Sequence, residues 1–526
     1  MILFAVSFSF KEEEFKMAFS CEKTDTNRIT MKYFKTEILA FFAWALVMIF
    51  EILWARIFWP YIGSSLFVWT SIIAVVLWAL AVGYYHGWVI SDKWAWNSYL
   101  SRLFFAAWIT FLCIYVYKDL ILSSLSANIQ DIRLLSLMLS LILLAPSSYI
   151  LGMIPPILIK QELRDIATWG HTVGRLGSIG TIWSIVGTLG AGFFLLPYFW
   201  VNSLILFLAL TCTLLSIFVV LKHDIILRGI FIVLIVLSWI HEYLKDQQQQ
   251  QKQNIYIYNS PYSRIEINDM HLENGQKIRN LFVDTVTHAG RYLNSDELLY
   301  PYTKYYHLFE ALNPKAQKVV MLWGAAYSYP QDFLKKYPEK SIDVVEIDKR
   351  MTEIAKKHFW LEENPRLRTF HQDGRVFLNR NAELYDAILW DAFGSFFSVP
   401  YQLTTLEAVQ KKYDSLTDHW VVILNIIWAL EWEKARFIEA QYLTYKAVFP
   451  EVFLLPVTDP QDTSMVQNIM LVALKDPTQI QELETESLSD DQREYLSRKT
   501  YLSGATWRLL TDNFAPVDYY IKALAK

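Results

Sequence analysis

Glycine is scarce in this sequence, while tryptophan is abundant. The 526 residues include 18 Gly and 20 Trp, whereas a usage of ~7 % would give about 37 Gly in a chain of this length. Glycine is the residue that most readily forms tight turns and lets backbones approach closely. The deficit therefore draws attention to turns at which tryptophan stands in place of a small residue.

Cysteine and net charge are low as well. The three cysteines, Cys21, Cys113 and Cys212, are far apart, and no CxxC motif or Cys/His cluster occurs. This spacing argues against a disulfide framework and a zinc site, so we expect no metal. The net charge is −4, which gives no sign of the basic surface that nucleic acid requires, and we expect no nucleic-acid partner.

Charge is missing from long stretches of the first half. An α-helix needs ~20 apolar residues to cross ~30 Å of hydrocarbon, and three of the apolar runs contain no charged residue. The pattern predicts a transmembrane bundle of about 7 helices embedded in a lipid bilayer. The seven runs, of which the last is the weakest, lie near 38–58, 64–85, 100–117, 134–155, 173–197, 201–221 and 226–241.

Three charged residues lie within these runs. Glu51 and Arg56 come toward the end of the first run, and Arg175 comes at the start of the fifth. Charged groups inside a membrane are costly, which favours a role in a substrate path. Near a span end they can instead pair or extend to the membrane surface.

Loop charges predict a cytoplasmic N-terminus. Lys and Arg residues precede the first span and follow the fourth and the sixth, whereas none lies between the fifth and sixth. Seven spans would then place the second half of the chain outside, in conflict with the use of a cytosolic nucleotide. We expect a multi-pass protein of the cell membrane with a cytoplasmic soluble half, and a miscount of one span would remove the conflict.

Composition changes after the last apolar run. A Gln-rich tract at 246–254 is typical of a linker, and alternating residues on both sides of Glu273-Asn274-Gly275 predict a small β unit. Buried strands then alternate with helices, which predicts a parallel, doubly wound, Rossmann-like nucleotide-binding α/β domain. The predicted boundaries are 1–36 for an N-terminal tail, 37–242 for the bundle, 243–254 for the linker, 255–300 for the β unit, 301–480 for the Rossmann-like domain and 481–526 for a helical tail.

Two candidate nucleotide-binding residues follow the first two strands of this domain. The carboxyl ends of strands are where open α/β sheets bind ligands. Gly324 begins a small-residue turn that would let a nucleotide approach the backbone, although an ordinary strand-to-helix turn has the same pattern. Glu346 ends the next strand about 20 residues later, where an acid binds the ribose hydroxyls; a solvated strand-end acid is the alternative.

Two further acids follow the next strands. Asp373, which precedes Gly374, would accept a hydrogen bond from an adenine amino group or cap a helix N-terminus. Asp391 would take a proton from an attacking amine beside the nucleotide cleft, or cap a loop. Each signal is weak alone, and their shared position at strand ends favours a nucleotide site.

From the β unit to about residue 475, the chain resembles the spermidine synthase family, the polyamine aminopropyltransferases. Ser260-Pro261-Tyr262 and Asp296-Glu297-Leu298-Leu299-Tyr300 carry the resemblance together with the strand-end positions. The fusion to a bundle resembles a membrane-linked branch of that family. The resemblance implies decarboxylated S-adenosylmethionine as co-substrate, or S-adenosylmethionine itself. It also implies roles for five residues in binding and catalysis: the ribose on Glu346, the adenine facing Asp373 and Gly374, Asp391 as proton acceptor and Tyr300 as active-site tyrosine.

The chain departs from the family pattern near the acceptor. Gly394 replaces a second acid, Pro301-Tyr302 replaces a His-Glu pair, and His288 replaces a glutamine that helps to hold the donor. We expect a membrane-bound aminopropyltransferase that acts on a small amine, with homo-oligomers possible. The alternatives are a methyltransferase that uses S-adenosylmethionine, and a transporter whose soluble half senses a nucleoside or polyamine.

Several tryptophans occupy positions that suit glycine. A glycine is expected at position 323 in the nucleotide turn, where a large side chain conflicts with close backbone approach. We hypothesise that UGA codons at such positions are read as glycine in the cell; the alternative is genuine tryptophan in an inactive site. The positions are Trp323, Trp360, Trp420 and Trp432 in the soluble half, and Trp54, Trp78, Trp88 and Trp183 where small residues would let helices approach.

Overall fold

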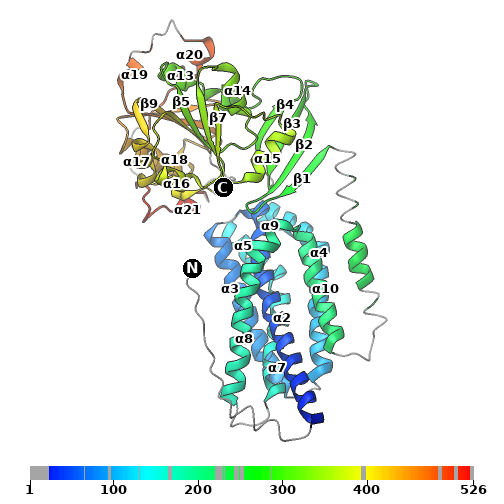
Figure 1. Ribbon diagram of the computed structural model, residues 1–526. Coiled ribbons are helices and arrows are strands. Elements are labelled where there is room, and N and C mark those ends of the chain that lie inside the picture. Colours follow the sequence, from blue (N-terminus) through cyan, green and yellow to red (C-terminus); the bar gives the residue numbers. More distant parts are fainter. Residues whose placement is uncertain are drawn as a thin grey trace.

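The computed structural model has a helical bundle at one end and an α/β half at the other (Figure 1). It describes residues 23–521 with gaps at 64, 93–95, 130, 164–168, 220–228, 230–231, 285, 392–398, 482, 484–487 and 503–507, and it describes only isolated residues between 242 and 253. The N-terminal tail predicted at 1–36 therefore lies largely outside the described residues.

The bundle consists of long apolar helices. Five helices among the described residues are long and apolar enough to cross a membrane, or six if the pair Ile132–Leu143 and Ala145–Glu162, bent by 47°, counts as one span. These agree with the first six predicted runs. The described part of the seventh is the helix Ile232–His241, which is shorter than the ~20 residues that a span needs. The helices are α2 Lys23–Ile62, α3 Leu66–Ser91, α4 Trp96–Asn128, α5 Ile132–Leu143, α6 Ala145–Gly152, α7 Ile154–Glu162, α8 Trp169–Gly190, the π-helix η2 Ala191–Leu195, α9 Leu196–Tyr198 and α10 Val201–Val219.

Close helix contacts in the bundle are made by glycine. A Cβ on Gly83 would lie 2.4 Å from the Tyr149 carbonyl oxygen, so α3 and α6 touch backbone to backbone there. Trp78 and Trp88 face outward, with 59 % and 43 % of their surface exposed. The prediction that these two tryptophans lie at close helix contacts was wrong. An apolar run does not indicate which of its residues face a neighbouring helix. Trp54 is fully buried.

Both arginines predicted inside the spans have protein partners. Arg56 donates hydrogen bonds to the carbonyl oxygens of Leu196 (3.0 Å) and Ser263 (3.1 Å), and thereby joins the bundle to the soluble half. Arg175 lies 3.7 Å from Glu37 and 3.9 Å from Glu162. The sequence left open a role in a substrate path or pairing near a span end, and pairing describes both arginines.

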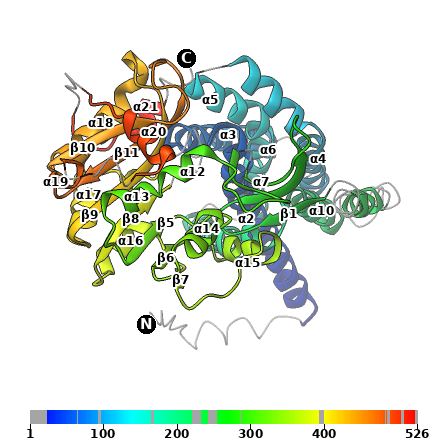
Figure 2. The ribbon, with the colours of Figure 1, turned by 90° about the horizontal axis from the view of Figure 1, so that it is seen from above.

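A four-stranded antiparallel sheet forms the predicted β unit. Its order is β1-β2-β3-β4, and Ser263, which precedes β2, is the residue that Arg56 contacts. In the two views the small sheet lies at the junction with the bundle (Figures 1 and 2). The strands are β1 Ile255–Asn259, β2 Arg264–His271, β3 Lys277–Val283 and β4 Val286–Tyr292.

A seven-stranded sheet of order β10-β11-β9-β8-β5-β6-β7 forms the centre of the soluble half. Strands β5 to β9 are parallel, as predicted. Strand β11 pairs antiparallel with both β10 and β9, so the sheet is mixed where a parallel one was predicted. The strands are β5 Lys318–Leu322, β6 Ser341–Val345, β7 Leu367–Phe370, β8 Tyr385–Trp390, β9 Leu416–Trp428, β10 Glu451–Pro456 and β11 Gln467–Leu474.

Helices cover both faces of this sheet. Alternate residues of β5 point to opposite faces, so Val320 and Leu322 belong to one core and Val319 and Met321 to the other. The helices of the first core are α16 Gly374–Arg380, α17 Leu406–Asp414, α18 Arg436–Lys446 and α21 Val517–Ile521. Those of the second are α12 Pro301–Tyr305, α13 Leu308–Leu312, α14 Ser328–Lys336 and α15 Lys349–His358, with α20 Asp490–Ser497 beside them.

Candidate functional site

The four predicted strand-end positions lie at one edge of the large sheet. Trp323-Gly324 follows β5, Glu346 follows β6, Asp373 follows β7 and Asp391 follows β8. The strand order runs outward from β5 in one direction and from β8 in the other. The crevice between β5 and β8 is therefore the topological switch point, where such sheets bind ligands.

Glu346 is buried and holds the nucleotide turn. One carboxylate oxygen accepts hydrogen bonds from the backbone N–H groups of Gly324 (3.1 Å) and Ala325 (3.2 Å), and the other from that of Asp348 (3.0 Å). Burial raises the pKa of Glu346 to about 7, although the backbone donors lower it. The oxygen that accepts from Asp348 has a further lone pair with which to accept from a ligand hydroxyl, whereas the other oxygen already accepts two hydrogen bonds.

Asp373 forms the N-cap of α16. Its side chain accepts from the backbone N–H groups of Arg375 (2.8 Å) and Val376 (3.0 Å), and Gly374 is the first helical residue. The capping role that the sequence offered as an alternative is therefore present. It leaves the second carboxylate oxygen with the capacity to face a ligand.

Asp391 lies between two hydrogen-bond donors. The Tyr302 hydroxyl donates to one carboxylate oxygen at 2.8 Å, and the Asn425 amide donates to the other at 2.8 Å. Burial raises the pKa of Asp391 to about 6, and the two donors oppose this by stabilising the charged form. A carboxylate with such a pKa is ionised at neutral pH and takes up a proton readily.

A cavity of about 230 Å³ opens beside Asp391. Its walls come from β4 of the small sheet, from the start of α12 and from the strand ends of the large sheet. Asp391 is the one carboxylate among the described residues that line it, and no Lys or Arg is among them. The lining consists of Val286, Thr287, His288, Tyr300, Pro301, Tyr302, Trp323, Asp391, Val399, Asn425, Ile427, Trp428, Val457, Thr458 and Asn468.

Tyr300 lines this cavity from the side of the small sheet. Its hydroxyl donates to Asn280 of β3 at 3.0 Å, and burial raises its pKa to about 12. Tyr300 is therefore a neutral hydrogen-bonding group at physiological pH. Of the predicted site residues, Tyr300 and Asp391 line the same cavity, whereas Glu346, Asp373 and Gly374 do not.

Three residues of the Asp391 environment were not predicted as site residues. Tyr302 was noted for its departure from the family pattern alone, and Asn425 and Asn468 were missed. Asn468 donates to the Asn425 side-chain oxygen at 3.0 Å, which orients the Asn425 amide toward Asp391. A signal was available, because Asn425 is the one polar residue between Val421 and Ile427.

Trp323 lines the cavity at the start of the nucleotide turn. Its ring stacks on His288, with centroids 5.7 Å apart and planes 8° from parallel, and it lines both the main cavity and a smaller one of about 30 Å³ next to Gly324 and Ala325. Asp391 and Tyr300 line the smaller cavity as well, whereas Glu346 and Asp373 line neither of the two.

Comparison with known proteins gives relatives for the soluble half. No family model matches the chain. The polyamine aminopropyltransferase of Vibrio vulnificus is 25 % identical over 233 residues, which cover 42 % of this chain and 75 % of that protein. The polyamine aminopropyltransferase of Alkaliphilus metalliredigens is 24 % identical over 145 residues, 27 % of this chain and 48 % of that protein. A solved structure of a probable spermidine synthase from Corynebacterium glutamicum has a TM-score of 0.39 and 17 % identity over 52 % of this chain and 93 % of its own.

Proposed function

We propose that the soluble half, which is homologous to polyamine aminopropyltransferases, transfers an aminopropyl group from decarboxylated S-adenosylmethionine to an amine. The observation that carries this proposal is the placement of Asp391. It lies at the topological switch point, lines a cavity and is held by two donors with a pKa raised to about 6. These are the properties of a general base.

The proposed reaction is a single displacement. The amine nitrogen attacks the aminopropyl carbon that is bonded to the sulfonium sulfur, the new C–N bond forms, and the C–S bond breaks with its electrons passing to sulfur. The products are a neutral thioether nucleoside and an alkylated ammonium. Asp391 takes the proton from that nitrogen, while Tyr302 and Asn425 hold the carboxylate in position.

The donor would be held by the adjoining strand ends. Glu346 has acceptor capacity left for one ribose hydroxyl. Asp373 has a free oxygen for an adenine amino group, and Gly324 lets the backbone approach the nucleoside. Tyr300 would contact the aminopropyl chain from the small sheet. These residue types fit an adenosyl donor. Trp323 does not fit, because its large ring lines both cavities at the turn where the nucleoside would approach.

The cavity also suggests the class of acceptor. Asp391 is the one acid among its described lining residues, and the adjacent segment 392–398 contains no acidic residue in its sequence. A doubly charged polyamine would leave a second ammonium without a carboxylate, which is costly in a partly desolvated site. We therefore propose an amine with one positive charge and an otherwise neutral chain.

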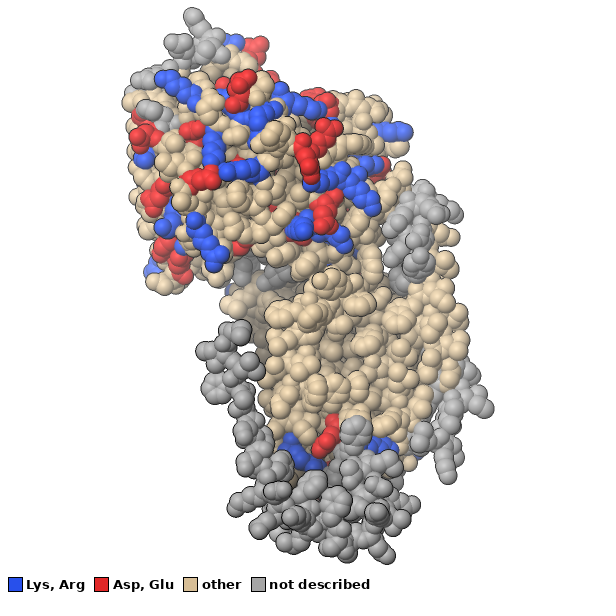
Figure 3. Space-filling view, in the orientation of Figure 1, with Lys and Arg blue, Asp and Glu red and all other residues tan. Residues whose placement is uncertain are grey.

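The membrane bundle would anchor this activity at a lipid bilayer. The apolar helices of the bundle are consistent with this. Figure 3 shows a band without charged side chains on this face of the bundle, between the charged soluble half and the far end.

Turnover of donor labelled in the aminopropyl chain, by the full-length protein in detergent, tests the function. We expect Asp391→Asn to lower kcat by ~10²–10⁴-fold, because it removes the base, and to leave donor affinity unchanged. Asp418→Asn is the matched control, since that acid is 97 % exposed and lies near the start of β9, away from the site. Wild-type turnover by Asp391→Asn would rule out Asp391 as the base, and transfer of a methyl group would replace the proposal with methyl transfer.

A further inference from the structure

The backbone at Trp323 has a conformation that suits glycine. Its φ is +85°, beyond the left-handed range of about +50° to +70° that is open to L-amino acids. The segment is tightly held: the Trp323 N–H donates to Val345 at 2.8 Å, and the next two N–H groups donate to Glu346. The strain therefore cannot be relieved by a small shift of a loose loop.

A second tryptophan has a left-handed backbone, at a helix end, where a bulky residue is an outlier. Trp360 has a φ of +56° and follows the C-cap residue of α15, Phe359. The next N–H, that of Leu361, returns to the Ala355 carbonyl oxygen at 3.2 Å and closes the helix. Glycine is the usual residue at this left-handed position, because it has no Cβ to clash.

Bulky side chains stand at three of the positive-φ positions in the described part of the chain, namely Trp323, Tyr327 and Trp360. Six non-glycine residues in the described part of the chain have positive φ. Asn254 and Asp284 are of types that tolerate this conformation, whereas a bulky side chain is a genuine outlier. The other two, Ala325 and Tyr327, belong to the same turn as Trp323. The whole chain has 20 Trp and 18 Gly, about half of the glycine expected from ~7 % usage.

We infer that the native protein carries glycine at positions 323 and 360, encoded by UGA codons that the source cell reads as glycine. One cause then explains the two strained backbones, the shortage of glycine and the excess of tryptophan. For position 323 the consequence rests on the proposed function: without the indole ring, which lines both cavities beside Asp391, a nucleoside has more room next to the turn that Glu346 holds.

The structure does not extend this inference to every tryptophan that the sequence singled out. Trp420 lies within β9 and Trp432 begins the 3-10 helix η4 Trp432–Ala435, both of them conformations that any residue adopts. Trp78 and Trp88 lie on the outside of the bundle. The argument from backbone strain therefore stands on positions 323 and 360.

Peptide mass spectrometry of the protein from its source cells tests the inference. We expect peptides that cover 319–334 and 358–366 to have the masses of glycine at 323 and 360. The same protein made in a standard host from a gene with UGG codons supplies the tryptophan-containing reference peptides. Tryptophan in the native peptides, or UGG codons in the source gene, would overturn the inference.

A variant series separates backbone strain from crowding. Alanine removes the indole but keeps the Cβ, so we expect the melting temperature to rise in the order Trp360, Trp360→Ala, Trp360→Gly. At position 323 we expect Trp323→Gly to bind 5′-methylthioadenosine, the nucleoside product of the proposed reaction, at least tenfold more tightly than Trp323→Ala. Equal melting temperatures for Trp360→Gly and Trp360→Ala would contradict the strain argument. If the enzymatic proposal alone were wrong, no variant would bind the nucleoside, yet the native peptides would still contain glycine.

Discussion

The pKa of Asp391 depends on two opposing effects, burial and a pair of hydrogen bonds. Burial raises its pKa to about 6, while Tyr302 and Asn425 favour the charged form. Because a base must be ionised to accept a proton, activity should fall on the acid side as pH drops through about 6. The two donors therefore control the pH range in which the site works.

Removing either donor should move the acid limb of the pH profile to higher pH. Tyr302→Phe and Asn425→Leu each leave the carboxylate with one hydrogen bond fewer, which destabilises the charged form and raises the pKa by roughly one unit. The pH dependence of kcat/KM for aminopropyl transfer measures this shift. Tyr501→Phe is the control, because that exposed tyrosine donates to Glu451, away from the site. An acid limb that stays in place in both variants would show that it reports another group.

The acids of the site could be predicted from the sequence, and their partners could not. Glu346 and Asp391 each end an apolar run, so the pattern alone places them at the sheet edge. Tyr302 lies 89 positions from Asp391, and Asn425 lies 34 positions from it. Which polar residues meet across such separations depends on strand order, and the sequence pattern does not specify it. The capping role of Asp373 was foreseen, because Asp is favoured at that position.

At the scale of elements, most strands and spans could be predicted from hydrophobic runs. The direction of β11, which runs against β10 and β9, was missed, because an apolar run looks the same in either orientation. The connection between them gives the clue: only residues 457–466 separate β10 from β11, whereas a parallel crossover needs about a dozen residues or more. The break between α5 and α6 was missed too, because residues 134–155 form one continuous apolar run.

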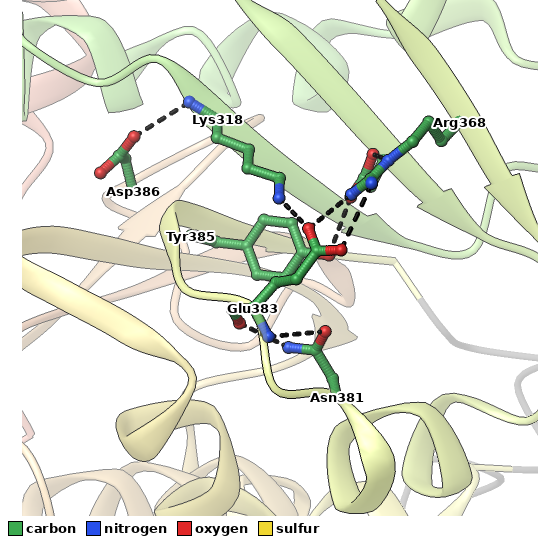
Figure 4. A network of polar contacts seen from close by, with 7 residues as sticks. Lys318, Arg368, Asn381, Glu383, Tyr385 and Asp386 are labelled. Carbon is green, nitrogen blue, oxygen red and sulfur yellow. Dashed lines mark hydrogen bonds and ion pairs between the residues drawn. The ribbon is translucent and has the colours of Figure 1, made fainter.

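A polar network ties the parallel strands together away from the site (Figure 4). The buried Asp343 of β6 accepts from Arg368 of β7 and from the Tyr385 hydroxyl of β8 at 2.8 Å. Lys318 of β5 and Arg368 both pair with Glu383, and these cations lower the pKa of Glu383 to about 2. The network links four strands whose opposite ends carry the candidate site.

We expect Asp343→Ala to destabilise the soluble half by about 1–3 kcal/mol, because it leaves the Tyr385 hydroxyl buried without its acceptor. Thermal unfolding of the full-length protein in detergent measures this as a lower melting temperature. Asp418→Ala removes an exposed acid that lies 3.7 Å from Lys475, and should change stability by less than about 0.5 kcal/mol. Equal melting temperatures for the two variants would show that the network does not hold the sheet.

At the scale of the whole molecule, the two ends of the bundle differ in charge. The soluble half is joined to one end through Arg56 and Ser263. Lys35 contacts Val219, and Lys160 pairs with Asp92, at the opposite end, where charged side chains are visible in Figure 3. The helix connections at the opposite end contain Lys93 and Arg164, whereas 63–65, 129–131 and 199–200, on the side of the soluble half, contain no Lys or Arg.

This asymmetry predicts on which side of the membrane the soluble half lies. Loops rich in Lys and Arg stay in the cytoplasm, so the end with Lys35 should be cytoplasmic and the soluble half should lie outside. Val219 lies at the opposite end and β1 begins at Ile255 on the side of the soluble half, so this orientation requires the short seventh run to cross as well. The arrangement thus favours the outward orientation over the cytoplasmic one that a cytosolic donor suggests.

Cysteine labelling in intact cells tests this orientation. In a variant without Cys21, Cys113 and Cys212, we expect Asp418→Cys, at a side chain that is 97 % exposed, to react with a membrane-impermeant maleimide before the cells are permeabilised. The cysteine-free parent controls for background labelling. Reaction only after permeabilisation would place the soluble half in the cytoplasm, within reach of a cytosolic donor, and α2 would then run against the positive-inside rule. Reaction in intact cells would mean that the donor must reach the outer side of the membrane before Asp391 can act.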